Sequence, residues 1–171
     1  MCIMNSSDQS LSDELSQLEF TAGWPESLLA ELAEISNYVE FADRSVIFAQ
    51  GSENHQLYLI CAGRVVLDML VPARGPVRIL TISRGELLAW STLVGDGLMT
   101  ATATVVEPVR AIAIDSIQLK LMCERRHDIG YEIMKRLATS LAHRLTATRL
   151  QLLDLYVHTT PHFFRPVEGI D

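Results

Sequence analysis

The sequence predicts an α+β fold: an antiparallel β-roll or jelly roll, with N-terminal helices before it and one long C-terminal helix after it. Two observations indicate this fold. Between Val39 and Ile114, short runs of β-type residues alternate with turns about every 8–12 residues, as in antiparallel sandwiches and barrels. From about Asp128 to Val157 the chain has no proline and repeats apolar residues at helical spacing.

Two helices are expected before the roll. Ser10 or Ser12 can cap a short acidic helix ending near Leu18, because a serine side chain accepts the first free backbone N–H groups. Pro25 suits the first turn of a second helix, which we expect to reach about Asn37 with one apolar face.

The expected strands of the roll are short apolar runs at residues 46–48, 57–60, 65–67, 77–82, 105–106 and 109–114. Ala62-Gly63 and the segment from Pro72 to Pro76 are expected to form turns between strands. Asp115 or Ser116 then caps a short helix that ends near Cys123.

The long helix carries a candidate dimer seam. Its members alternate four- and three-residue steps: Met134, Ala138, Leu141, Leu145, Thr148, Leu152 and Leu155. Three heptads of this pattern are typical of a coiled coil and predict a homodimer. The alternative is that the same face packs on the roll, and both uses can coexist. We therefore divide the chain into a flexible N-terminal tail with a short acidic helix (1–24), the roll with flanking helices (25–123), a dimerisation helix (124–158) and an irregular tail (159–171).

Charge and cysteine content narrow the class of protein. The net charge is −7, and residues 1–43 hold nine Asp or Glu but no Lys or Arg, which disfavours a nucleic-acid partner. The three cysteines form no C-x-x-C pair, as expected in a reducing cytoplasm. There is no basic and apolar leader, and no apolar run reaches the ~18 residues of a membrane span. We expect a cytoplasmic protein without a membrane partner.

The segment from Val46 to Leu67 reads V-I-F-A-Q-G-S-E-N-H-Q-L-Y-L-I-C-A-G-R-V-V-L. It resembles the opening of cyclic-nucleotide-binding domains of the catabolite-activator or Crp/Fnr type. The residues that carry the resemblance are Gly51, Leu57, Tyr58, Ile60, Gly63 and Val65. The similarity continues through R-G-E-L-L-A-W-S-T-L-V and T-A-T-A-T-V-V, and it covers about residues 25–157. It implies a cyclic-nucleotide-binding-like roll and a dimerising helix, and thus a non-catalytic regulatory or sensory domain for signal transduction.

The resemblance also implies a ligand site. In this family a phosphate-binding cassette holds the cyclic phosphate with backbone amides and an arginine, and the ribose with a glutamate. We call residues 85–102 the cassette. Aligning Gly85 with the first cassette glycine places Ala89 and Trp90 at the usual Gly-Glu pair, and Met99 at the arginine.

A second alignment takes Gly85-Glu86 as the Gly-Glu pair. It restores the acid but supplies no arginine beside Thr100-Ala101, because the nearest basic residues, Arg84 and Arg110, lie outside the motif. Loss of the charged contact removes a few kcal/mol, about a hundredfold in affinity. The sequence therefore predicts an altered cassette that does not bind cyclic AMP or GMP in the usual way.

The predicted ligand pocket comprises Gly85, Glu86, Leu88, Ala89, Trp90, Ser91, Met99, Thr100, Ala101 and Thr102. It would bind an unidentified small ligand, or the domain would act on a protein partner. Two alternatives stay open. The chain can be a genuine cyclic-nucleotide receptor with a non-standard pocket, or a scaffold protein whose pocket is plugged by Trp90.

Other chemistry finds little support. No nucleophile–base pair, phosphate loop or metal-ligand cluster is present, so we predict no enzyme and no metal. Haem needs only one or two axial ligands, and the candidates are His55, His143, Cys61 and Cys123, but haem binding is disfavoured. No cofactor is expected beyond a cyclic nucleotide. About fourteen residues follow Val157, too few for a helix-turn-helix module.

Overall fold

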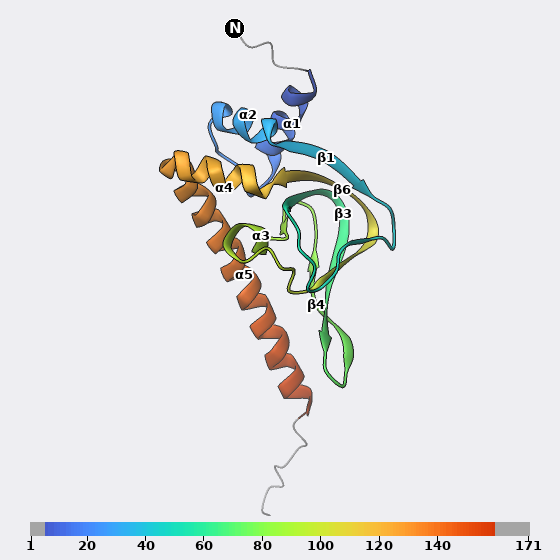
Figure 1. The fold of residues 1–171 in the computed structure, drawn as a ribbon. Helices are drawn as coiled ribbons and strands as arrows, with labels where there is room; N and C mark the ends of the chain where they lie inside the picture. The colour runs from blue at the N-terminus through green and yellow to red at the C-terminus, as the bar shows by residue number, and fades with distance from the viewer. Residues whose placement is uncertain (1–5, 160–171) are drawn as a thin grey trace, which may run out of the picture.

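The structure is a computed structural model that describes residues 6–159, with side chains from Leu11 to Leu150. Its elements in chain order are α1 (Ser6–Gln17), α2 (Glu26–Glu34), β1 (Ser36–Phe41), β2 (Val46–Phe48), β3 (Gln56–Val71), β4 (Gly75–Ile82), β5 (Leu87–Leu88), α3 (Ser91–Val94), β6 (Thr102–Asp115), α4 (Ser116–Arg125) and α5 (His127–Thr159). Helices lie beside and above a curled sheet, and α5 extends well past it (Figure 1). The predicted α+β fold with an antiparallel sheet is confirmed.

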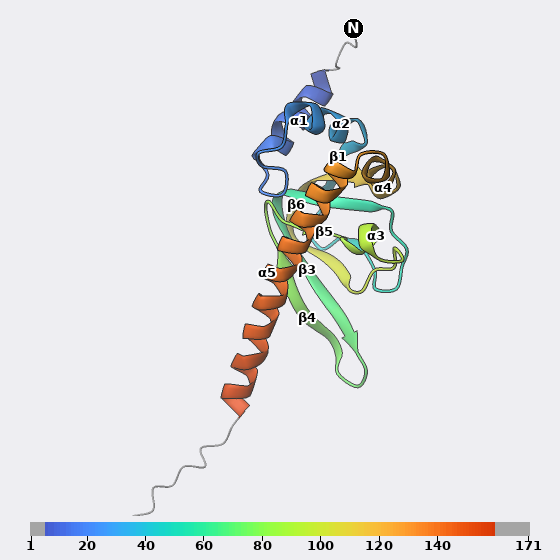
Figure 2. The ribbon, with the colours of Figure 1, turned by 90° about the vertical axis from the view of Figure 1, so that its left-hand side faces the viewer.

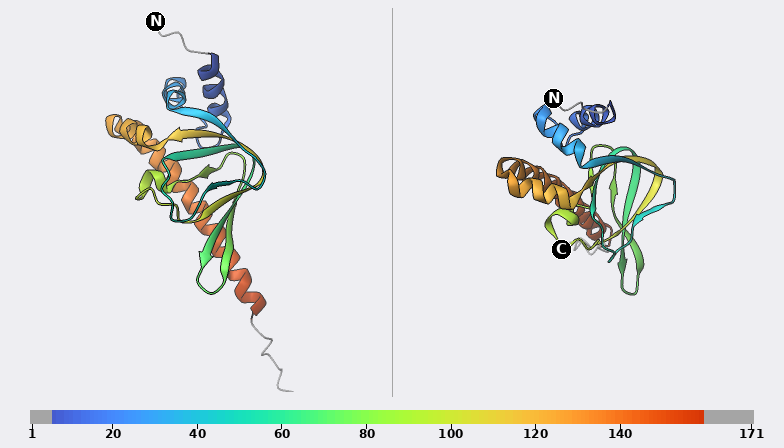
Figure 3. Two further views of the ribbon diagram at one scale, coloured as in Figure 1. Left: turned by 45° about the vertical axis from the view of Figure 1, so that its right-hand side comes forward. Right: turned by 45° about the horizontal axis from the view of Figure 1, so that its top comes forward.

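The sheet is antiparallel throughout, in the order β1-β6-β3-β4, with β2 paired to β6 and β5 paired to β3. The two long strands, β3 and β6, lie side by side at its centre and curve strongly, so that the sheet rolls over on itself (Figure 3). The β3–β4 hairpin projects away from the roll, and its loop lies within the predicted Pro72–Pro76 turn.

The predicted turn at Ala62-Gly63 is wrong, because β3 continues through it without a break. Gly63 has φ +86°, and a Cβ there would lie 2.1 Å from the carbonyl oxygen of Pro108. The β3–β6 register shifts at this point, which identifies a bulge where two backbones approach closely. Pro108 likewise interrupts no strand, since a bulge tolerates a residue without an N–H. The expected pairs of short strands are therefore two long, bent ones.

Strong alternation along β3 divides the interior into two cores. Leu57, Leu59 and Cys61 belong to a cluster shared with the helices, which we call the helical-side core. Tyr58 and Ile60 belong to a second cluster inside the roll. Successive side chains of a strand point to opposite faces. This part of β3 is therefore an unbroken apolar run because both of its faces are covered.

The N-terminal helices pack firmly against the sheet. α1 begins at Ser6, one turn before the predicted caps, and its Leu15 is fully buried, as is Leu18 just after it. α2 has Pro25 as its N-cap and ends at Glu34, earlier than predicted, because β1 already begins at Ser36.

The C-terminal helices begin where the sequence predicts. Asp115 caps α4, and its carboxylate accepts the N–H groups of Ile117 and Gln118, each at 2.9 Å. α5 then crosses the roll in front of β5 (Figure 2). Its first half buries Ile133 and Leu137 against the helical-side core. No helix in residues 6–159 is both long enough and apolar enough to span a bilayer.

Candidate functional site

The cassette borders a small hollow between the roll and α5. Its lining residues are Phe48, Leu67, Leu88, Ala89, Trp90, Ser91, Met99, Thr100, Ala101 and Arg144. We call this space the cassette hollow. Its volume is about 20 Å³, which is room for about one water molecule. Most of the predicted pocket residues therefore come together, but they enclose almost no free space.

Met99 and Trp90 line the hollow with apolar side chains. The Met99 side chain is 3% exposed, and its sulfur lies 3.9 Å from both the Asn54 amide nitrogen and the Ser91 hydroxyl. Trp90 is half-buried and packs against the helical-side core. An apolar pair thus stands where the first alignment expects a cation and an acid.

The backbone at Ala89 agrees with that first alignment. Ala89 has φ +65°, a left-handed conformation that glycine adopts freely and alanine adopts at a cost of about 1–2 kcal/mol. The glycine of a Gly-Glu pair is suited to such a turn. This conformation is compatible with the first alignment, in which Ala89 and Trp90 stand just before α3, although Gly85 has a positive φ as well.

Gly85 and Glu86 lie outside the cassette hollow. The Gly85 N–H donates to the carbonyl of Ile60 at 2.8 Å, and the Glu86 carboxylate accepts the N–H of Ser83 at 2.7 Å. Both residues border a different cleft, described below. The second alignment therefore restores an acid that does not line the hollow.

The two threonines of the predicted pocket differ in their surroundings. Thr100 lines the hollow and is exposed. The Thr102 hydroxyl accepts the N–H of Gln50 at 3.0 Å and is not among the lining residues. Of these two threonines, Thr100 is the one that lines the hollow.

Arg144 is the cation that sequence reasoning missed. It comes from α5, its guanidinium donates to the carbonyl of Leu87 on β5, and it lines the cassette hollow. Its Nε is buried and has no hydrogen-bond partner among the described residues. Burial lowers the pKa of Arg144, although the nearby Glu86 carboxylate opposes this shift. No cassette motif signals a residue that arrives from another helix.

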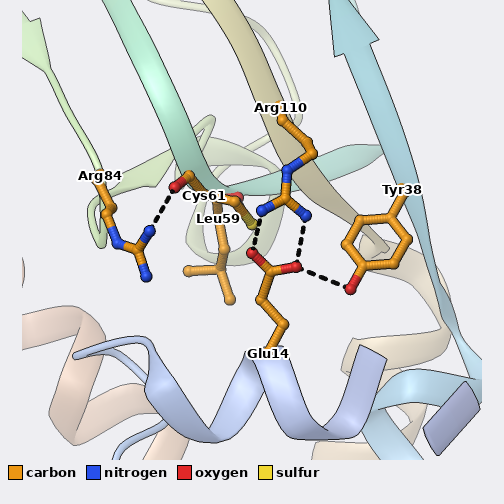
Figure 4. A network of polar contacts seen from close by, with 6 residues as sticks. All are labelled: Glu14, Tyr38, Leu59, Cys61, Arg84 and Arg110. Atoms are coloured by element: carbon orange, nitrogen blue, oxygen red, sulfur yellow. Dashed lines mark hydrogen bonds and ion pairs between the residues drawn. The ribbon is translucent and has the colours of Figure 1, made fainter. Parts of the chain in front are cut away.

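The two arginines considered from the sequence serve other contacts (Figure 4). Arg84 donates to the carbonyl of Cys61 at 3.3 Å. Arg110 on β6 forms two hydrogen bonds with the Glu14 carboxylate on α1, at 2.6 and 2.7 Å, and the Tyr38 hydroxyl adds a third at 2.8 Å. The ion pair of Glu14 and Arg110 therefore connects α1 to β6 of the sheet.

The same network sets the charge states around Cys61. Burial tends to raise the pKa of Glu14, but the hydrogen bonds from Arg110 and Tyr38 outweigh it and hold that pKa below its ordinary value. Burial, together with the Glu14 carboxylate, raises the pKa of the Cys61 thiol to about 11. Burial also raises the pKa of Cys123. Both thiols are therefore protonated at neutral pH, which makes them poor ligands. Among the described residues no three His, Cys, Asp or Glu side chains gather into a possible metal site.

The residues of the predicted seam on α5 differ in burial. Met134 and Leu141 pack against the protein's own helical-side core. Ala138 and Leu145 are exposed, Leu145 by 52%. Thr148 is half-buried, and its hydroxyl donates to the carbonyl of Arg144 at 3.0 Å. The side chains of Leu152 and Leu155 lie outside the described part of the chain.

Residues 38–126 match the family model for the cyclic nucleotide-binding domain. A CRP-like cAMP-activated global transcriptional regulator of Mycobacterium tuberculosis is 28% identical over 136 residues, covering 79% of this chain and 58% of that protein. The chain thus spans little more than half the length of this relative.

Among solved structures, a cyclic nucleotide-binding protein from Geobacter metallireducens superposes with a TM-score of 0.71 at 26% identity, covering 83% of this chain and 99% of that one. The regulatory subunit of a cAMP-independent protein kinase A from Trypanosoma cruzi, bound to guanosine, has a TM-score of 0.62 at 17% identity, covering 68% of this chain and 42% of that one.

Proposed function

The chain belongs to the cyclic nucleotide-binding domain family, and we propose that it is a non-catalytic sensor whose ligand enters the cassette hollow and repositions α5. The observation that carries this proposal is the position of Arg144. The same guanidinium lines the hollow and bonds the Leu87 carbonyl, so it joins α5 to the cassette side of the roll. A ligand that draws the Arg144 guanidinium toward itself would strain that bond and change the position of α5 relative to β5.

Usual binding of cyclic AMP or GMP is disfavoured by space and by charge. Drug-sized ligands occupy pockets of about 300–1,000 Å³, far above the about 20 Å³ of the cassette hollow. Met99 presents a thioether where the family places a guanidinium. Entry of any ligand therefore requires Trp90 and α5 to move, and the energy for this comes from the ligand.

The ligand that fits best is flat and weakly charged. Trp90 offers an aromatic face, and the unpaired Nε of Arg144 offers one donor. The Trypanosoma cruzi subunit, which has the same fold, was solved with guanosine, a nucleoside without a phosphate. That similarity motivates a nucleoside or related heteroaromatic compound as the first class to test.

We further propose that the working unit is a homodimer formed through the exposed side of α5. Tyr131, Ala138 and Leu145 share one side of the helix, and Tyr131 and Leu145 are 64% and 52% exposed. Pairing two such helices would bury apolar surface that the single chain leaves in water. Repositioning of α5 would then alter the dimer and the surface that it offers to a partner protein.

The test is a thermal-shift titration with guanosine, cyclic AMP, cyclic GMP and cyclic dinucleotides. A ligand at a hundred times its dissociation constant adds about 2.7 kcal/mol of stability. Guanosine should shift the melting temperature saturably in the wild type, and Trp90→Ala should change that response because it removes the stacking face. Met99→Arg should create or increase a response to cyclic AMP or GMP, whereas the uncharged control Met99→Leu should not.

Two other outcomes would redirect the interpretation. A saturable wild-type response to cyclic AMP would identify a genuine receptor with a non-standard pocket. If the wild type, Trp90→Ala and Met99→Arg all ignore every ligand while remaining folded, the sensor proposal is overturned. The filling of the hollow by Trp90 and Met99 then favours a scaffold that acts through its surface.

A further inference from the structure

A second and larger hollow lies where three distant segments meet. Its walls come from the α1–α2 turn, the β4–β5 turn and α5, and its volume is about 180 Å³. The lining residues that matter for its chemistry are Glu19, Glu86, Arg136, Ser140, His143 and Arg144. We call this space the Arg136 cleft. It shares only Arg144 with the residues that line the cassette hollow.

One wall of the Arg136 cleft is rich in hydrogen-bond donors. Arg136, Ser140 and Arg144 follow one another at four-residue spacing, so they lie along one side of α5. The Arg136 guanidinium donates to the carbonyls of Glu19 and Ala22 at 3.0 and 2.6 Å. A guanidinium has five N–H groups, and these bonds occupy only part of that capacity.

The two carboxylates of the cleft stand on the other walls. The Glu86 carboxylate already accepts the Ser83 N–H at 2.7 Å, and its charge partly balances the buried Arg144. Glu19 is exposed. The buried Arg144 Nε still lacks an acceptor among the described residues, although one carboxylate is near. An acceptor supplied from solution on the α5 side would satisfy it.

The volume limits what can enter. A cavity of about 150 Å³ accommodates benzene, so the about 180 Å³ inside this cleft suits a group slightly larger than a six-membered ring. We propose that the Arg136 cleft binds a small organic anion, a phosphate or carboxylate on a body no larger than one ring, held between the guanidinium groups of Arg136 and Arg144. This site shares the Arg144 guanidinium with the cassette hollow, but its other lining residues are separate.

The experiment uses the full chain with phenyl phosphate and benzoate as probes, against sodium chloride at equal ionic strength. The arginine Nε–Hε signals are followed by two-dimensional NMR. The signals of Arg136 and Arg144 should shift saturably, and the probe that binds more tightly identifies the preferred anion. Arg136→Gln should weaken binding about tenfold, the effect of losing one charged contact.

Controls separate this site from general attraction and from the cassette. Arg149→Gln removes an exposed charge of α5 outside the cleft and should leave affinity unchanged. Arg136→Gln also removes the bonds to the α1–α2 turn, so a second variant of the cleft is needed. His143→Ala, at an exposed position that makes no such bond, should weaken anion binding about threefold. No saturable shift with either probe, or equal weakening by Arg149→Gln, would overturn the proposal. Binding lost on Thr100→Ala but kept in Arg136→Gln would place the anion in the cassette hollow, overturning this site alone.

Discussion

Ala89 and Gly85 show that a backbone angle alone does not separate the two alignments of the cassette. From the sequence, Gly85-Glu86 and Ala89-Trp90 could each stand for the Gly-Glu pair. Both Ala89 and Gly85 have a positive φ, but Ala89 lines the cassette hollow whereas Gly85 borders the other cleft. Their positions, and not their backbone angles, favour the first alignment.

Replacing Ala89 by glycine should stabilise the protein. Relief of the left-handed strain outweighs the extra chain entropy of glycine, so we expect a gain of about 0.5–1 kcal/mol, or about 1–4 °C in melting temperature. Ala142→Gly, at an exposed position of α5, is the matched control and should cost about 1 kcal/mol. Thermal unfolding measures both, and a loss of stability in Ala89→Gly would contradict the strain argument.

Glu14 predicts a dependence of stability on pH. Its pKa is lowered in the folded protein, so the ion pair with Arg110 contributes fully above the unfolded pKa, near 4.5, and is lost as pH falls through the folded value. Glu14→Gln should therefore cost about 1 kcal/mol at pH 7 and progressively less as the pH falls below about 4.5.

The control for Glu14 is the exposed pair of Arg64 and Glu107, whose side chains are 52% and 48% exposed. Glu107→Gln should change stability by less than about 0.5 kcal/mol at either pH. Chemical denaturation at pH 7 and pH 3 measures both variants. If Glu14→Gln were equally destabilising at both pH values, the effect would come from packing and not from the charge.

Among the elements, β3 and β6 show what a sequence pattern can and cannot predict. The apolar runs, the Pro72–Pro76 hairpin loop and the Asp115 cap were all predictable, because each depends on neighbouring residues. The continuity of β3 through Gly63 was not, since a glycine with positive φ serves a turn and a bulge equally well. Only the approach of Pro108, from a distant segment, distinguishes them.

The site was predictable to the same extent. The local segments around Trp90 and Met99 were identified, whereas Arg144 lies 57 residues along the chain from the Leu87 carbonyl that it binds. The pairing of Glu14 with Arg110 spans 96 residues and escapes detection for the same reason. Long-range polar contacts leave no periodic trace in a single sequence.

The exposed side of α5 carries a prediction about assembly. Leu145→Asp should convert the proposed dimer to monomers, because it places a charge in the apolar seam. Leu150 is 59% exposed but lies about 140° around the helix from Leu145, so Leu150→Asp is the matched control and should leave the dimer intact. Light scattering on size-separated samples gives the masses. A monomeric wild type, or equal effects of both variants, would contradict the proposed seam.

At the scale of the whole molecule, α5 connects several parts that are distant in sequence. It buries Ile133 and Leu137 in the core shared by the helices and the sheet, bonds β5 through Arg144, and bonds the α1–α2 turn through Arg136. The N-terminal helices are held by their apolar packing and by polar contacts that include the Arg136 bonds to α5 and the pair of Glu14 and Arg110 on the sheet. A shift of α5 relative to the roll must strain or break one of these attachments.

The Arg136 bonds to Glu19 and Ala22 therefore have a thermodynamic consequence. Suppose that a ligand in the cassette hollow changes how firmly the N-terminal helices are held. A protein that binds those helices must then change the affinity of the hollow for its ligand by the same factor, because linkage between two binding events is reciprocal. The acidic surface of α1 and α2 would then both report ligand binding and influence it. A partner bound there could set the ligand concentration to which the domain responds.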